Sequence, residues 1–174
     1  LHHPVEYQNH IFDQLMEAGK EFGLKPYGIR AMNSLRVEKS YKLVGTELSI
    51  EYSPYESGLD RFIHPNKGDF IGRAALDKWR AKGFSNKLVT MEIHGVTDAD
   101  VLGNNPIYDN GSVVGRATSG DFGFRLNKSI ALGMVKPELA KVGQKLKIDI
   151  LGKMHEASIV EESPYDSENK LLRA

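Results

Sequence analysis

The sequence has no cysteine among its 174 residues. This absence excludes a disulfide, a thiolate metal site and a cysteine nucleophile, and it is typical of a reducing compartment, so we expect the cytoplasm or a mitochondrial matrix. Long apolar runs are also absent, since no run approaches the roughly 20 residues of a membrane-spanning helix. The start of the chain, residues 1–7, lacks the basic and apolar parts of a signal peptide. We therefore predict no membrane partner.

An excess of charge of either sign is lacking as well. The 23 Lys and Arg residues balance the 23 Asp and Glu residues, so the formal net charge is zero at pH 7. No global field would attract a polyanion, and we predict no nucleic-acid partner. The six histidines are dispersed, without a pair at the spacing of a helical metal site, so we predict no metal.

The apolar residues follow a helical period in the first half of the chain. Their spacing predicts an amphipathic helix over residues 5–22 that ends at Gly23, and a shorter helix within residues 28–38 that passes into a loop. A third helix is expected to follow Asp69, which is a suitable capping residue, and to end at Gly83.

Beyond residue 84 the apolar and polar residues alternate, which is the pattern of strands. Asn110-Gly111 lies between two such runs and is a strong signal for a two-residue hairpin, and Leu151-Gly152 divides the last run in the same way. Five or six short strands over about 80 residues cannot bury both faces of a flat sheet, so a small closed barrel is favoured. The predicted fold class is α+β, with a helical N-terminal part and a small antiparallel β-barrel.

Three runs resemble a known family: GIRAMNSLRVEKSYKLVGTELSIEYSPYESGL at 28–59, KGDFIGRAAL at 67–76 and VGRATSG at 114–120. They are similar to the glycine cleavage T-protein (aminomethyltransferase) family and to the folate-binding region of dimethylglycine and sarcosine dehydrogenases. The resemblance implies that residues 1–84 are the C-terminal remainder of a folate-binding domain with a linker helix. It also implies that residues 85–174 form the C-terminal barrel domain.

For function, the resemblance implies transfer of a one-carbon unit from an amine to tetrahydrofolate. The amine would be of the glycine, dimethylglycine or sarcosine type, and in a dehydrogenase an upstream domain would hold FAD. The family's catalytic acid lies before Leu1, so we expect a fragment that has no catalytic residue of its own and no turnover. The strand edge left open by the missing upstream half favours either a homodimer or an irregular N-terminal region.

Three residues are the candidates for binding the cofactor. Arg36 lies in the Ser-Leu-Arg-x-Glu signature, where it would clamp a carboxylate or belong to a structural Arg-Glu network. Glu56 follows a proline turn in 53–59, where it would accept hydrogen bonds from a pterin ring or hold neighbouring backbone amides. Arg30 is a candidate because Met32 replaces an arginine that T-proteins carry at that position.

The glycine-rich run 115–120 lacks the spacing and the lysine of a phosphate loop. It is interpreted as a tight connection between strands, and the resemblance places Thr118 and Ser119 near a ligand. Three functional readings stay open for the whole chain: a fragment of a folate-dependent transferase, a non-catalytic folate-binding member, and a structural domain of a larger flavoprotein.

Overall fold

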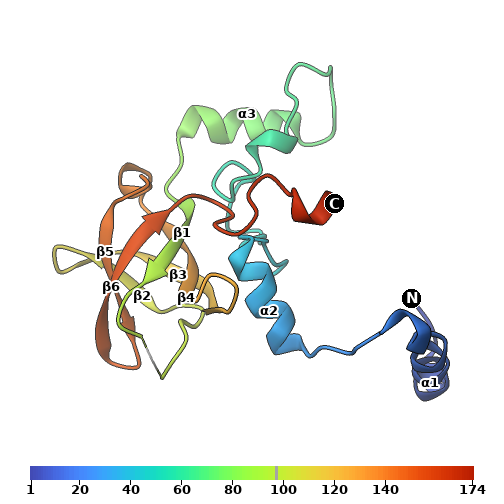
Figure 1. The fold of residues 1–174 in the computed structure, drawn as a ribbon. Coiled ribbons are helices and arrows are strands. Elements are labelled where there is room, and N and C mark those ends of the chain that lie inside the picture. The colour runs from blue at the N-terminus through green and yellow to red at the C-terminus, as the bar shows by residue number, and fades with distance from the viewer. Residues whose placement is uncertain (97) are drawn as a thin grey trace. The chain divides into compact units, whose positions relative to one another are not determined.

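The computed structural model describes residues 1–96 and 98–174 (Figure 1). Two compact units are present, Leu1–Met32 and Asn33–Ala174. This division is not the same as the predicted domains 1–84 and 85–174, which stay a prediction.

The first unit is helical. Helix α1 spans Gln8–Ala18 and is flanked by the 3-10 turns η1 (Val5–Tyr7) and η2 (Lys20–Phe22). Gly23 then adopts the left-handed conformation, with φ 66°, that ends a helix readily. The helix predicted over residues 5–22 is therefore confirmed, although only its middle is α-helical. Helix α2 (Ile29–Glu38) begins in this unit and continues into the second.

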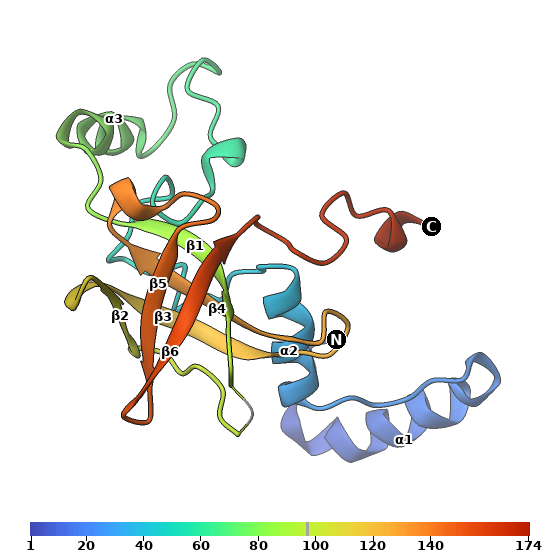
Figure 2. The ribbon, with the colours of Figure 1, turned by 60° about the vertical axis from the view of Figure 1, so that its left-hand side comes forward.

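The second unit contains a closed antiparallel barrel in the order β1-β4-β3-β2-β5-β6 (Figure 2). This confirms the predicted barrel. Because its sheet closes on itself, the described part of the barrel has no free edge, and the open-edge argument for a homodimer does not apply to it. The strands are β1 (Lys87–Ile93), β2 (Pro106–Asp109), β3 (Ser112–Gly123), β4 (Lys128–Val135), β5 (Lys145–Ile150) and β6 (Lys153–Val160).

Both hairpin predictions are confirmed. Asn110 and Gly111, each with a positive φ, join β2 to β3, and Leu151 and Gly152 join β5 to β6 in the same way. This backbone conformation is the one that a two-residue hairpin turn requires. The remaining short turns of the second unit are η3 (Asp60–Phe62), η4 (Pro137–Leu139) and η5 (Leu171–Arg173).

The glycine-rich run 115–120 lies inside β3, so the predicted connection between strands is wrong. A Cβ on Gly115 would lie 2.2 Å from the Met134 carbonyl oxygen, which shows that the glycine permits close approach of β4. The β3-β4 register then shifts between Ala117 and Ser119. Thr118 is the extra residue of this β-bulge, a feature that bends a strand and re-aims its side chains.

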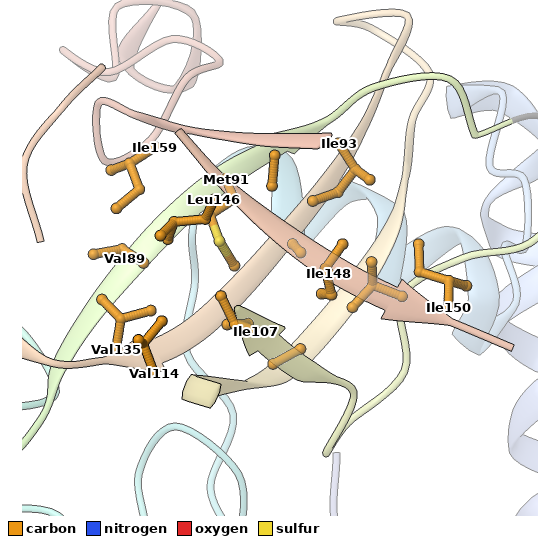
Figure 3. Close-up of a cluster of buried hydrophobic side chains, with 14 residues drawn as sticks. Val89, Met91, Ile93, Ile107, Val114, Val135, Leu146, Ile148, Ile150 and Ile159 are labelled. Carbon is orange, nitrogen blue, oxygen red and sulfur yellow. The ribbon is translucent and has the colours of Figure 1, made fainter. Parts of the chain in front are cut away.

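The barrel interior is an apolar core (Figure 3). Met91, Ile107 and Ile148 are fully buried in it. Strand β4 is unusual because seven successive residues are buried, which places apolar side chains on both of its faces. Ile130 and Leu132 are buried but do not belong to the interior cluster. A strand that is buried on both faces must be covered on the outside.

The cover is the segment from Asn33 to Gly58, which is bonded to the two neighbours of β4. On one side the Leu88 amide of β1 donates to the Glu56 carbonyl oxygen at 2.8 Å. On the other side Ser34 Oγ donates to the Phe122 carbonyl oxygen of β3 at 2.6 Å. The segment therefore crosses the outer face of the β1-β4-β3 sheet, and its polar residues form the candidate site.

Residues 59–85 contain no buried residue, and neither do residues 161–174 at the end of the second unit. Helix α3 (Arg73–Lys82) ends at Gly83 as predicted, but its N-cap is Gly72 and no side chain caps it. The expected cap, Asp69, instead accepts a hydrogen bond from the Phe70 amide at 3.0 Å. Within the described ranges 1–96 and 98–174, no helix combines the length and apolar character needed to span a bilayer.

Candidate functional site

Helix α2 presents polar side chains to the barrel along one stripe. Asn33 Nδ2 donates to Asp121 Oδ2 at 2.6 Å and to the Gly120 carbonyl oxygen at 3.2 Å. Asp121 also accepts from the Phe122 amide at 2.8 Å. These bonds fix the C-terminal half of α2 on β3, next to the bulge. They determine the orientation of the arginine one turn further along the helix.

Arg36 is that arginine, and its side chain is only 10% exposed. Its Nε and Nη2 donate to Asn33 Oδ1 at 2.9 and 2.7 Å, and its Nη1 donates to the Tyr41 carbonyl oxygen at 3.2 Å. Nη1 also lies 3.5 Å from Glu47 Oε2. Burial lowers the pKa of this guanidinium, and the nearby Glu47 and Asp121 carboxylates act against that effect. Most of its donors are therefore used within the chain.

Glu47 is fully buried and connects the loop to the barrel. Its Oε2 accepts from the Leu43 amide at 2.9 Å and from Thr46 Oγ1 at 2.7 Å. Its Oε1 accepts from Ser119 Oγ at 2.5 Å, across to the bulge of β3. Burial is the largest influence and raises the pKa of Glu47, but the hydrogen bonds outweigh it and hold that pKa below its ordinary value.

Glu38, the acid of the Ser-Leu-Arg-x-Glu signature, has no contact with Arg36 in this network. The residue is 1% exposed, and its Oε1 accepts from the Arg125 and Leu126 amides at 2.7 and 3.3 Å. Its backbone carbonyl oxygen accepts from the Tyr165 amide at 3.0 Å. Glu38 therefore joins α2 to the β3-β4 turn and to the C-terminal segment.

Glu56 is 5% exposed and accepts four hydrogen bonds. Oε2 accepts from the Ser53 amide and hydroxyl, both at 2.9 Å, and Oε1 accepts from the Ser85 and Asn86 amides at 3.2 and 3.1 Å. Burial raises its pKa, but these donors more than compensate, so the pKa of Glu56 lies below its ordinary value. This carboxylate holds the turn at 53–56 to the entrance of β1.

The three predicted cofactor-binding residues thus fall in different surroundings. We call the polar residues of the segment from Asn33 to Gly58, together with the residues of β3 that they contact, the polar layer. Arg36 and Glu56 both belong to it, and each is hydrogen-bonded to neighbouring parts of the chain. Arg30 lies in the first turn of α2, within the first unit, and is exposed.

Sequence reasoning missed Glu47 and Asp121, the acids nearest to Arg36. A single buried acid in a loop, such as Glu47, leaves no periodic signal, and Asp121 is one polar residue near the end of strand β3. Among residues 1–96 and 98–174, no three His, Cys, Asp or Glu side chains gather as a metal site. The buried acids of the layer each accept several hydrogen bonds from the chain. The arrangement is therefore suited to holding the backbone of the loop and the guanidinium of Arg36 in place.

The family models match most of the chain. Residues 86–166 match the model described as "Glycine cleavage T-protein C-terminal barrel domain", and residues 1–67 match the "GCVT N-terminal domain". Both describe the same family of proteins. The barrel of the structure, which begins at Lys87, coincides with the first of these matches.

Named relatives agree with this result. Human mitochondrial dimethylglycine dehydrogenase is 39% identical over 163 residues, which are 93% of this chain and 19% of that protein. The aminomethyltransferase of Desulfitobacterium hafniense is 36% identical over 157 residues, 90% of this chain and 42% of that protein. The chain therefore spans less than half the length of these relatives.

A solved structure supports the fold. The glycine cleavage system aminomethyltransferase T from Bartonella henselae superposes with a TM-score of 0.72 and 24% identity, covering 79% of this chain and 38% of that one. At this identity the likeness concerns the fold alone. The two matched models, which together account for residues 1–67 and 86–166, and the named relatives give the assignment: the chain belongs to the glycine cleavage T-protein family.

Proposed function

We propose that this chain is part of a tetrahydrofolate-dependent aminomethyltransferase-type protein. The protein would transfer a one-carbon unit from an amine of the glycine, dimethylglycine or sarcosine type to tetrahydrofolate. The observation that carries the proposal is the polar layer. The motifs at 34–38 and 53–59, which are far apart in the sequence and both typical of the family, are parts of one bonded structure on the barrel.

Tetrahydrofolate, when bound, supplies the nitrogen nucleophile that accepts the carbon. The residues of this chain fit a positioning role toward it better than direct contact. A carboxylate offers about four lone-pair sites, and four donors of the chain already occupy those of Glu56. Arg36 is similarly committed to Asn33, Tyr41 and Glu47. Both would hold the shape of the pocket wall.

Arg30 has a different part in the proposal. It is exposed, and a guanidinium is suited to binding a carboxylate by two parallel hydrogen bonds, so Arg30 is the candidate for direct contact with the acidic end of the folate. Met32 stands at a position that is arginine in T-proteins, which favours a dimethylglycine or sarcosine substrate. In that branch FAD would be held by another domain.

A second candidate function is a folate-binding or structural domain without chemistry of its own, within a larger flavin-dependent oxidoreductase. The saturation of Glu56 and Arg36 by contacts within the chain favours it. The two candidates differ in whether the full-length polypeptide turns over an amine.

The test is a calorimetric titration of tetrahydrofolate into this chain and into the full-length polypeptide that carries it. We expect binding by the full-length protein alone, weakened about tenfold by Glu56→Ala, which corresponds to about 1.4 kcal/mol. Arg30→Gln should weaken binding similarly. Glu138→Ala, which removes an exposed acid of η4, is the matched control. If neither protein binds tetrahydrofolate, the folate proposal fails and a structural domain remains.

A further inference from the structure

A hollow of about 250 Å³ lies on the barrel beside the polar layer, and it contains none of the three predicted cofactor-binding residues. Its floor includes Arg116 and Thr118 of β3, on the two sides of Ala117. One wall is the loop that carries Ser49 and Glu51, and the other is the turn at Asn104. We call this site the Arg116 hollow. Its residues all belong to the second unit.

The turn at Asn104 forms a fixed wall. The Asn104 amide donates to the Ala117 carbonyl oxygen at 2.8 Å, and the Ala117 amide donates back to the Asn105 carbonyl oxygen at 2.8 Å. Both bonds attach the turn to β3 at the bulge of Thr118. Bulges are frequent beside binding sites because they re-aim side chains. The hollow is therefore bounded on this side by backbone that is hydrogen-bonded to β3.

Arg116 is held in one orientation by a buried tyrosine. Its Nε and Nη2 donate to the Tyr52 hydroxyl at 3.0 and 2.6 Å, and Tyr52 is 8% exposed. Nη1, by contrast, has one long hydrogen bond, to Asn104 Oδ1 at 3.5 Å. The hydrogen bonding of Arg116 to the Tyr52 hydroxyl oxygen, which accepts, is the main reason that the pKa of Arg116 is raised. The guanidinium is thus fixed along one edge, and its Nη1 group retains donor capacity.

Glu51 forms an ion pair with Arg116 on the solvent-exposed side. Its Oε2 accepts from Nη2, but its side chain is 60% exposed and that of Arg116 is 45% exposed. An exposed ion pair of this kind contributes only about 0–1 kcal/mol. Ser49 Oγ accepts from the Glu51 amide at 3.2 Å, which leaves its hydroxyl proton able to donate. A second carboxylate would meet Arg116, Ser49 and Asn104 together if Glu51 moved aside.

We propose that the Arg116 hollow is a binding site for the carboxylate of a small ligand, which replaces Glu51 on Nη2 of Arg116 and also accepts from Nη1. Two sources share this chemistry, a small amino acid with its own carboxylate and the glutamate tail of a folate. The hollow can take either group, since its volume exceeds that of a carboxylate with a few attached atoms. The choice of these two sources rests on the proposed function, whereas carboxylate binding by Arg116 is measured without tetrahydrofolate and without turnover.

The experiment is a titration of the isotope-labelled 174-residue chain, followed by ¹H-¹⁵N NMR without tetrahydrofolate. One arm adds N,N-dimethylglycine, a second adds p-aminobenzoyl-glutamate and a third adds sodium chloride at matched ionic strength. We expect saturable shifts at the amides of Ser49, Asn104 and Thr118 with one of the two carboxylates, and none with chloride. The arm that saturates identifies the source of the carboxylate.

The direction in which substitutions change the affinity for the carboxylate distinguishes a binding site from a structural ion pair. Glu51→Gln removes the competing acid and should tighten carboxylate binding about threefold, in line with the small free energy of an exposed pair. Glu162→Gln, which removes a half-exposed acid paired with Lys42 elsewhere, should leave it unchanged. Arg116→Gln should abolish binding, and Arg116→Lys should weaken it about tenfold because a lysine cannot bind a carboxylate through two groups.

Three results would overturn the proposal. Shifts of equal size with chloride would show a nonspecific anion effect only. Weaker binding after Glu51→Gln would show that Glu51 supports the ligand or the fold and does not compete. Saturable shifts confined to residues outside the hollow would place the carboxylate elsewhere. Arg125→Gln, in the β3-β4 turn, controls for the loss of one exposed arginine.

Discussion

The interior of the barrel and the polar layer on its outside are both buried, but they are held together by opposite chemistry. Inside, Met91, Ile107 and Ile148 are fully buried in a cluster of apolar side chains. Outside, Glu47 is as deeply buried as Ile107 but is held by directional hydrogen bonds. Apolar packing tolerates exchange of one residue for another of similar volume, whereas a buried acid requires each of its partners.

A substitution in the barrel interior is expected to cause the largest loss in the free energy of unfolding. Ile107→Ala removes a fully buried side chain that touches the position of Gly133, and should lower the free energy of unfolding by about 4 kcal/mol, since a large cavity remains. Urea denaturation followed by circular dichroism measures the loss. Leu151→Ala, at an 82% exposed side chain of the β5-β6 turn, should cost below about 0.5 kcal/mol. Equal losses for the two variants would show that Ile107 is not part of a packed interior.

A second variant breaks the polar layer. Glu47→Ala leaves Arg36 and Ser119 without their acid and should cost about 3 kcal/mol, because one partner of a buried charged network stays behind. Glu47→Gln keeps the shape and should cost less, although its amide group would face donors. The same denaturation assay separates them. A loss below about 0.5 kcal/mol for Glu47→Ala would show that the layer contributes little to stability.

The sequence predicted the interior well, for a physical reason. Alternating residues specify which face of a strand is buried, and Asn110-Gly111 specifies where a hairpin turns, so the barrel and both hairpins followed from local pattern. The helices α1, α2 and α3 were found by the same means. The start of α3 was misplaced because Asp69 bonds its neighbour's amide and Gly72 begins the helix.

The polar layer was only partly predictable. The quoted motifs located Arg36 and Glu56, but no spacing rule pairs Arg36 with Glu47, eleven positions along the chain and in a loop. The bulge at Thr118 was also missed, because glycine in a strand and glycine in a turn give the same local signal. Such contacts form only in the tertiary fold, and the periodicity of apolar residues in a single sequence does not reveal them.

A third prediction uses pH to separate the two regions. The pKa values of Glu47 and Glu56 in the folded chain lie below their ordinary value of 4.5. The unfolded chain therefore binds more protons on acidification, so the stabilisation by each carboxylate is complete above pH 4.5 and is lost as the pH falls through the folded pKa.

Glu56→Gln should cost about 1.5 kcal/mol at pH 7, as for a hydrogen-bonded charged group, and should flatten the dependence on pH below 4.5. Ile107→Ala should lower the free energy of unfolding by the same amount at every pH, because no titrating group is lost. Denaturation series at pH 3.5, 5 and 7 measure both. A steeper acid dependence in Glu56→Gln than in the original chain would contradict the lowered pKa.

The smallest effect is expected in residues 59–85, which separate the two buried regions in sequence and contain no buried residue. Ile71 is completely exposed, so Ile71→Ser removes no packing within the chain and should change the free energy of unfolding by less than about 0.5 kcal/mol. Leu132→Ser is the matched control, because Leu132 is fully buried under the polar layer. It should cost several times more, since it both loses apolar burial and buries a hydroxyl. If Ile71→Ser were as damaging as Leu132→Ser, the exposed segment would have to pack on the chain, and the contrast between covered and uncovered regions would fail.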